Sequence, residues 1–386
     1  MILPNAIKTA MNILENGGFE CFAVGGCVRD FVMGRIPGDY DLTTNAEPQE
    51  MISCFEGFRI IETGIKHGTV TVLIDGNNVE ITTYRVDGEY KDNRHPEEVR
   101  FTSRLSEDLS RRDFTVNAMA YSKKNGLVDL FGGREDIEKK TMRCVGDPDK
   151  RFSEDGLRIL RALRFASVLD FDIEAKTAES IIRNKNLLDN ISRERVFSEL
   201  TKLICGSGAE RVIAGFGGVF EVCFGKCVNP EGISKTPAVP SVRYSALLRD
   251  FDDVKSVMRS LRADNKTADC VSKVCDNLKK DYPDEKSVKR LVRDIGADNA
   301  AVLGGALRAF YSADDCTAFE KRLETAKKSC CTVSQLDITG SDVIGLGLKG
   351  CSVGKALNAA LDAVIDGVLE NKMDKLSDFV KSMLDN

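Results

Sequence analysis

The hydrophobic pattern of this 386-residue chain changes near residue 153, and this change constrains the fold more than any other feature. Before it, short runs rich in β-branched residues alternate with helical patterns and are bounded by Gly, Asn and Asp. After it, apolar residues recur at intervals of three and four, as in "SEDGLRILRALRFASVL" and "RERVFSELTKLI". The pattern predicts an α+β protein whose mixed sheet is confined to the first third and whose remainder is stacked helices.

The strand signals of the first third are short and well bounded. The runs that predict strands are "CFAVGG", "DYDLTT", "FRIIET", "GTVTVLID" and "NNVEITTYR". The last two flank a turn at 75–78, which predicts a β-hairpin. Helical patterns lie between the strands, near 28–33 and 48–55.

Composition excludes several classes of protein. The formal net charge is -5, which argues against a surface that binds nucleic acid everywhere, so any RNA site must be a local patch. The 13 cysteines form no C-x-x-C pairs, which favours reduced side chains over a disulfide scaffold. No apolar run is long enough to cross a bilayer, and the first 20 residues have the pattern of an amphipathic helix instead of a signal peptide. We therefore predict a cytoplasmic protein without a membrane partner.

The stretch "FAVGGCVRDFVMGRIPGDYDLTT" at 22–44 carries the first chemical signal. If "DYDLTT" is a strand, Asp39 and Asp41 project from the same face because side chains alternate along a strand. Two carboxylates so close repel each other unless a cation lies between them, and Mg²⁺ prefers oxygen ligands. Glu80, in "NNVEITTYR", is placed to bring a third carboxylate to the same face of the sheet. The pattern predicts a site for two magnesium ions and phosphoryl or nucleotidyl transfer.

Two adjacent glycines precede this acidic pair. Gly25 and Gly26 allow the backbone to approach an anion closely, and the helix that follows offers free N–H groups. A nucleoside triphosphate fits between the glycines and the carboxylates. A lone D-x-D is also typical of solvated charge at a strand end, and a lone G-G of an ordinary turn. The order and spacing of the two motifs together favour the nucleotide site.

Further motifs follow in order: "RRDFTVNAMAY", "EDGLRILRALRF" and "RERVFSEL". Together with "GGCVRD" and "DYD", they cover 20–205 and resemble the class II (bacterial and eukaryotic) tRNA nucleotidyltransferases. These are the CCA-adding enzymes of the tRNA nucleotidyltransferase/poly(A) polymerase family. The resemblance implies a polymerase-β-like nucleotidyltransferase head at 1–138, followed by an all-α neck at 139–205, body at 206–330 and tRNA-binding tail at 331–386.

The resemblance also implies roles for individual residues. Asp39 and Asp41 match the metal-binding pair, and Glu80 is implied as the third catalytic carboxylate. The residues that match the triphosphate-cradling turn are Gly25, Gly26, Arg29 and Asp30. Those that match the motif for the ribose of the incoming nucleotide are Arg111, Arg112, Asp113 and Asn117. The chemistry agrees, because Asp113 accepts and Asn117 both donates and accepts hydrogen bonds, as a 2′-hydroxyl requires. A salt bridge at a helix entry is the alternative for these residues.

Base selection is implied for the next motif. Asp155, Arg158 and Arg161 fall three residues apart on one face of the expected helix 153–169. An Asp and an Arg at that spacing also form ordinary surface ion pairs. A carboxylate that accepts beside a guanidinium that donates matches the base edge shared by cytosine and adenine, so the pair can select CTP and ATP without a template. The resemblance places Arg161 nearer the phosphates and has Arg195 and Glu199 brace the helix.

The implied function is template-independent addition of CCA to the 3′ end of tRNA from CTP and ATP, with two Mg²⁺ ions and release of pyrophosphate. The implied partner is tRNA, held at its 3′ end and at its elbow, and Lys349 and Lys355 flank glycines in the tail. Ordinary surface lysines on a helical cap are the alternative for these two.

Within the family, an A-adding enzyme and a bacterial poly(A) polymerase are the alternatives. Poly(A) polymerase is disfavoured because "ETGIKHGTVTV" stands where a basic and aromatic stretch is expected and the chain ends acidic. CC-only addition is disfavoured because the chain keeps the loop 85–109, in which Glu97, Glu98 and Arg100 are predicted to belong to a mobile element. A non-catalytic RNA-binding protein and a small-molecule nucleotidyltransferase are the alternatives outside it. The sequence gives no oligomeric state.

Overall fold

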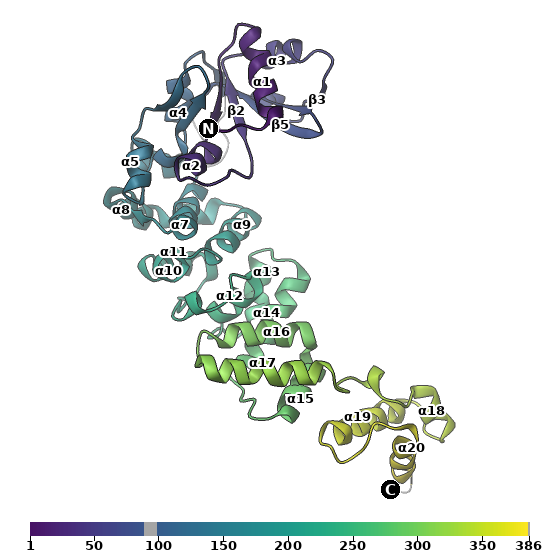
Figure 1. Cartoon of the computed structure of the whole chain (residues 1–386). Helices are drawn as coiled ribbons and strands as arrows, with labels where there is room; N and C mark the ends of the chain where they lie inside the picture. The colour runs from purple at the N-terminus through teal and green to yellow at the C-terminus, as the bar shows by residue number, and fades with distance from the viewer. Residues whose placement is uncertain (89–98, 385–386) are drawn as a thin grey trace. The chain divides into compact units, whose positions relative to one another are not determined.

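The computed structural model describes residues 1–88 and 99–384. The chain forms two compact units, Met1–Cys227 and Val228–Asn386, each of which is described by itself (Figure 1). No helix within the described residues is both long and apolar enough to cross a membrane.

A seven-stranded mixed sheet is formed by residues 21–129 of the first unit. Its strands are β1 (Cys21–Val24), β2 (Asp41–Thr44), β3 (Arg59–Ile61), β4 (Thr69–Ile74), β5 (Asn77–Thr83), β8 (Met119–Ser122) and β9 (Gly126–Asp129). The strand order is β3-β4-β5-β2-β1-β8-β9. Strands β2 and β5 are parallel, whereas the other neighbours are antiparallel. The predicted mixed sheet is confirmed.

The predicted hairpin is also confirmed. Strands β4 and β5 pair with Ile74 opposite Asn77, and Asp75 and Gly76 form the turn. Both turn residues have positive φ, 49° and 76°, as a two-residue type I′ turn requires. The second hairpin, β8–β9, has no counterpart in the sequence prediction, because the Met and Ala of β8 have weak strand preference and pairing with β1 decides their conformation.

The two faces of the sheet differ. On one face Val70, Val72 and Ile81 are fully buried, where α1 (Asn5–Asn16) and α3 (Pro48–Cys54) pack on β4 and β5. On the other face Glu80 is exposed and Thr82 is half-buried. This open face carries the candidate site.

The first unit also contains shorter elements. They are the helices α2 (Gly26–Val32), α4 (Leu105–Ser110) and α5 (Gly133–Glu138), and the two-stranded ribbons β6–β7 (Arg85–Asp87 with Val99–Phe101) and β10–β11 (Thr141–Met142 with Asp172–Ile173). The segment 85–109, which was predicted to be an unpatterned loop, therefore contains the strands β6 and β7 and most of α4. Its residues Glu97 and Glu98 lie outside the described residues, whereas Arg100 belongs to β7.

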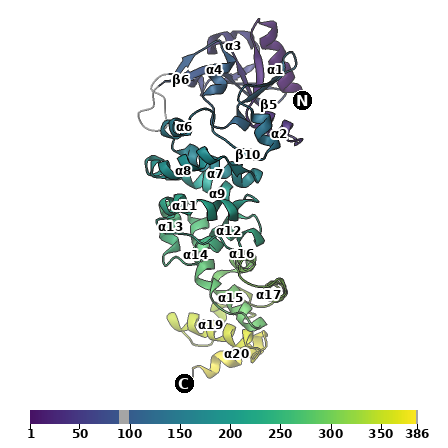
Figure 2. The ribbon, with the colours of Figure 1, turned by 90° about the vertical axis from the view of Figure 1, so that its left-hand side faces the viewer.

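Helices make up the rest of the first unit. They are α6 (Pro148–Glu154), α7 (Leu157–Leu169), α8 (Ala175–Asn184), α9 (Arg193–Ile204), α10 (Ala209–Gly215) and α11 (Gly217–Phe224). Figure 2 shows α7 and α9 side by side, and these two helices are in extensive contact. Short 3-10 helices occur in both units at Ile65–His67, Thr115–Asn117, Lys185–Asn190, Ile233–Lys235 and Val333–Gln335.

The single helix expected over 153–169 is wrong. The chain breaks between α6 and α7, where Asp155 is extended (φ -143°) and Gly156 precedes the new helix. The Asp155 carboxylate accepts a hydrogen bond from the backbone N–H of Leu157, as a capping aspartate does. A Cβ on Gly156 would lie 2.9 Å from the Leu187 carbonyl oxygen, so close packing also requires glycine at the break.

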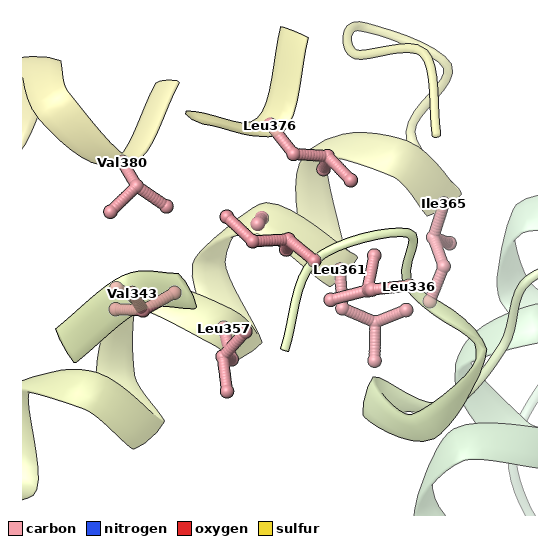
Figure 3. Close-up of a cluster of buried hydrophobic side chains, with 10 residues drawn as sticks. Leu336, Val343, Leu357, Leu361, Ile365, Leu376 and Val380 are labelled. Atoms are coloured by element: carbon pink, nitrogen blue, oxygen red, sulfur yellow. The ribbon is translucent and has the colours of Figure 1, made fainter. Parts of the chain in front are cut away.

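The described residues of the second unit form helices and connecting loops and contain no strand. Its helices are α12 (Pro240–Leu247), α13 (Val254–Ser260), α14 (Asn265–Leu278), α15 (Glu285–Ile295), α16 (Ala297–Leu307), α17 (Ala313–Lys327), α18 (Gly340–Gly345), α19 (Cys351–Ile365) and α20 (Met373–Ser382). The last three surround a hydrophobic core of their own, in which Leu336, Leu361 and Leu376 point toward one another (Figure 3). The boundary between the two units, at 227/228, falls inside the range assigned to the body, and the four-part division remains a proposal.

Candidate functional site

Acidic side chains gather at the edge of the open sheet face. Asp41 and Glu80 are direct neighbours on the parallel strands β2 and β5, so both project from the same face. Both line a pocket of about 230 Å³. Their carboxylates are exposed and make no hydrogen bond or ion pair with the described residues. The structure therefore brings these two predicted residues together.

Asp39 was predicted to lie in the same strand as Asp41, but it precedes that strand. Strand β2 begins at Asp41, which pairs with Val24, so Asp39 and Tyr40 precede the strand. The predicted strand alternation fails here because β1 ends at Val24 and leaves the two earlier residues without a partner. Asp39 is exposed, and its negative charge still acts on Asp41.

The charges around Asp41 oppose one another. Partial removal from water raises the pKa of the Asp41 carboxyl, the guanidinium of Arg112 lowers it, and the like charge of Asp39 raises it again. The net effect is a pKa above the ordinary value. A cation bound between Asp39 and Asp41 would relieve this repulsion.

The donor set fits a hard divalent cation that completes its coordination with water and phosphate oxygens. Asp39 and Asp41 offer carboxylate oxygens that have no hydrogen-bond or ion-pair partner within residues 1–88 and 99–384. Among the described residues, no group of three or more His, Cys, Asp or Glu side chains is arranged to hold a metal ion by itself. Binding of a cation by Asp39 and Asp41 therefore stays a prediction, in which substrate phosphates and water would supply the other ligands.

The glycine turn lies at the end of β1, next to Asp41. Gly25 has a positive φ of 74°, and Gly26 begins α2. A Cβ on Gly25 would lie 3.2 Å from Nη1 of Arg112. Glycine is therefore required here both by the backbone conformation and by the close approach of the arginine.

A buried chain of polar side chains links this turn to α7. Arg29 donates to Asp30 through Nη2 (2.8 Å) and to the side-chain oxygen of Asn117 through Nη1 (2.7 Å). Asn117 donates to Oδ1 of Asp113 at 3.3 Å, and Arg161 donates twice to Oδ2 of Asp113, at 2.9 and 2.6 Å. Residues predicted to bind triphosphate, ribose and phosphate thus belong to one network.

The network already uses the acceptor capacity of Asp113. Oδ1 accepts from Asn117 and from the backbone N–H of Phe114, and Oδ2 accepts twice from Arg161. Contact between Asp113 and a 2′-hydroxyl would have to displace one of these donors. The ribose role of Asp113 stays a prediction, while its role in holding Arg161 is visible in the structure.

Asp113→Asn is expected to lower the free energy of unfolding by about 1.5 kcal/mol at pH 7, because it removes a charge-assisted hydrogen bond. Burial alone would raise the pKa of the Asp113 carboxyl, but Arg161 outweighs it and the pKa lies below the ordinary value. The stabilisation is therefore complete above about pH 4 and is lost as the pH falls through the lowered pKa. Urea denaturation followed by circular dichroism from pH 7 downward measures the difference, which should shrink in acid. A constant difference would contradict the assignment.

The sequence predicted Asp155 and Arg158 on one continuous helix, whereas the structure places Asp155 before α7. Asp155 lies before α7 and accepts from Nη2 of Arg195 at 2.9 Å. Arg158 instead donates to Glu154 at 2.6 Å and to the backbone oxygen of Arg111 at 3.3 Å. Each of the two side chains thus has a hydrogen-bond partner of its own. A shared role in reading a base stays a prediction.

The expected bracing of α7 by α9 is confirmed. Arg195 holds Asp155, and Glu199, which is buried, accepts from Arg164 at 3.2 Å. Arg164 also lies over the ring of Phe165, with its guanidinium carbon 4.0 Å from the ring centroid. These contacts fix the face of α7 that carries the predicted nucleotide-binding arginines.

The prediction missed Asp108, which accepts hydrogen bonds from both Arg111 and Arg112. The signal was present, because an acid three and four residues before two arginines is the spacing of helical ion pairs.

In the second unit, Lys355 lies on α19 and Lys349 precedes it, and both are exposed. Their predicted contact with tRNA stays a prediction.

Comparison with known families finds two matches. A model of the poly(A) polymerase head domain matches residues 21–143, and a model of the probable RNA- and SrmB-binding site of polymerase A matches 170–215. The chain is 48% identical over 207 residues to a CCA-adding enzyme of Lactobacillus helveticus and 47% identical over 203 residues to one of Bacillus pumilus. These alignments cover 53% of this chain and 51% and 50% of the relatives, so the chain matches about half the length of these curated proteins.

Solved structures match the chain over its whole length. A Bacillus stearothermophilus CCA-adding enzyme in complex with CTP superposes with a TM-score of 0.82 at 29% identity, covering 99% of this chain and 98% of the other. A Thermotoga maritima CCA-adding enzyme complexed with tRNA matches with a TM-score of 0.70 at 21% identity, covering 99% and 96%, and shows the same fold. The expected arrangement of a polymerase-type head followed by helices is confirmed.

Proposed function

Because this chain belongs to the tRNA nucleotidyltransferase/poly(A) polymerase family, we propose that it adds C, C and A to the 3′ end of tRNA. The substrates are CTP and ATP, and pyrophosphate is the second product. One observation carries the proposal: Asp41 and Glu80 are in register beside the Gly25 turn, in a chain similar over its whole length to a CCA-adding enzyme that binds CTP.

The chemistry assigned to the acidic edge is nucleotidyl transfer. Asp39 and Asp41 would hold Mg²⁺, which shields the triphosphate and lowers the pKa of the attacking 3′-hydroxyl. Glu80 adds a third negative charge to the same face of the sheet. Gly25 leaves room beside Arg112 for the phosphates to approach the backbone.

Recognition of the base and the sugar is assigned to the residues at the α7 end of the buried network. Asp155, held by Arg195, and Arg158, held by Glu154, would present an acceptor and a donor to the base edge shared by cytosine and adenine. Arg161 is fixed by Asp113 and would lie nearer the phosphates. One set of side chains can then select both nucleotides, and this favours complete CCA addition over the A-adding alternative.

Two further assignments complete the proposal. The loop 85–109 is assigned the switch from CTP to ATP, and the tail is assigned the elbow of the tRNA. The cytoplasmic location also remains a proposal, made from the sequence.

The test supplies tRNA transcripts that end at the discriminator base, after the second C or after the final A. Each transcript is incubated with CTP, ATP or both in the presence of MgCl2, and the products are sized on a gel. We expect three nucleotides to be added to the first transcript, one A to the second and none to the third. The intact third transcript is the control for uncontrolled extension.

Other outcomes identify the alternatives. Extension of the second transcript alone would make this an A-adding enzyme. Long A tails on unrelated RNA would make it a poly(A) polymerase. Absence of nucleotide incorporation into every transcript would overturn the proposal.

A further inference from the structure

A fully buried carboxylate lies under the candidate site. Asp108, on α4, has no exposed side-chain surface. It accepts from Nε and Nη2 of Arg111 at 3.0 and 2.7 Å, from Nη2 of Arg112 at 3.3 Å and from the backbone N–H of Arg85 at 3.4 Å. One side chain thus contacts three arginines from two segments of the head.

All three arginines line the same pocket as Asp41 and Glu80. The pocket therefore holds cations and free carboxylates together, and such groups attract each other strongly when they are partly removed from water. Asp108 supplies the hydrogen bond and ion pair recorded for Arg112 among the described residues. Without Asp108, the carboxylates of Asp41 and Glu80, which line the same pocket as Arg112, would be left to attract this arginine.

The electrostatics agree with this geometry. Burial alone would raise the pKa of the Asp108 carboxyl, but Arg111 and Arg112 outweigh burial and the pKa lies below its ordinary value. Asp108 is therefore charged at neutral pH and matches the arginines it contacts. The positive charge of Arg112 nevertheless reaches Asp41, whose pKa it lowers.

We propose that Asp108 is a positioning residue for nucleotide binding: it holds Arg111 and Arg112 against the wall of the pocket and keeps them from pairing with the carboxylates of Asp41 and Glu80. The arginines then remain available to the phosphates of an incoming nucleoside triphosphate. Arg85 connects the same carboxylate to the base of the β6–β7 ribbon. The inference rests on the proposed function, because it assumes that the pocket takes a nucleoside triphosphate.

The test measures binding of CTP with MgCl2 by isothermal titration calorimetry in the absence of tRNA, so that turnover plays no part. Asp108→Asn keeps the shape of the side chain and removes its charge. We expect the dissociation constant for CTP to rise at least about tenfold, since each charge-assisted hydrogen bond to an arginine is strong. The melting temperature of each variant is measured alongside.

Asp136→Asn is the matched control. Asp136 is also buried in the head and also accepts from an arginine, Arg143, at 2.9 Å, but it does not line the pocket. This variant should lose stability and keep its affinity for CTP. A general effect of removing a buried carboxylate would change both variants alike.

A double-mutant cycle tests the connection to the arginine. If Asp108 acts through Arg112, then Arg112→Gln should cost much less affinity for CTP in the Asp108→Asn background than in the parent. Equal costs in the two backgrounds would overturn the proposal, as would unchanged affinity in a folded Asp108→Asn variant. If Asp108→Asn does not fold, the affinity of the single variant Arg112→Gln for CTP tests the proposal. An affinity equal to that of the parent would then overturn it. A parent protein that binds no CTP would overturn the proposed function and this inference together.

Discussion

Asp41→Asn is expected to reduce nucleotide addition by about a thousand-fold while the fold stays intact. The carboxylate lies on the open face of the sheet beside Glu80. Its removal takes a negative charge from the proposed reacting centre and breaks no hydrogen bond or ion pair of this side chain with the described part of the chain. Loss of about 4 kcal/mol of transition-state stabilisation corresponds to this factor. Single-turnover addition of CMP to tRNA measures it, and Asp39→Asn should behave similarly.

Asp75→Asn is the control for this experiment. Asp75 is an exposed aspartate in the turn between β4 and β5, and Asn tolerates its positive φ of 49°. The control should retain the rate of the parent, and circular dichroism should show the same fold in all variants. Glu80→Gln should also slow the reaction. Near-normal rates in both Asp39→Asn and Asp41→Asn would contradict the proposal that these two residues bind the metal.

The second large effect is expected on the choice of base. Asp155→Ala should weaken discrimination against UTP and GTP by about 10- to 100-fold, because it removes one charge-assisted hydrogen bond to the base. The same variant frees Arg195, whose Nη2 lies 2.9 Å from Asp155. Incorporation rates for each of the four nucleotides, at fixed tRNA concentration, measure the change, and tRNA affinity should change less.

Asp172→Ala is the matched control for base choice. Asp172 also pairs with an arginine, Arg211, at 2.7 Å, but it is highly exposed and lies away from the acidic pocket lining. Surface pairs of this kind contribute little, so its selectivity should equal that of the parent. If misincorporation of UTP and GTP is unchanged in both Asp155→Ala and Arg158→Ala, then the two residues have a structural role and do not select the base.

Local sequence signals account for much of the fold. The alternating runs at β4 and β5 and the Asp75–Gly76 turn predicted the hairpin, because side-chain period and turn chemistry act over a few residues. The sequence did not predict the hairpin β8–β9, because its conformation depends on pairing with β1, which is distant in the sequence. The sequence also did not predict the break between α6 and α7, because the apolar period continues through the capping aspartate Asp155 and through Gly156, which packs on Leu187.

The candidate site divides in the same way. The sequence by itself determined which residues are chemically able to act: the glycine turn, the aspartates of "DYD", Glu80 and the arginine-rich motifs, since residue type and order are local properties. The tertiary structure alone decided the partners. Strand register placed Glu80 beside Asp41, and packing of the helices brought Asp113 to Arg161 and Asp155 to Arg195. Partners separated by dozens of residues meet only when the sheet and the helices pack, and a buried charge takes whichever partner that packing brings within hydrogen-bond distance.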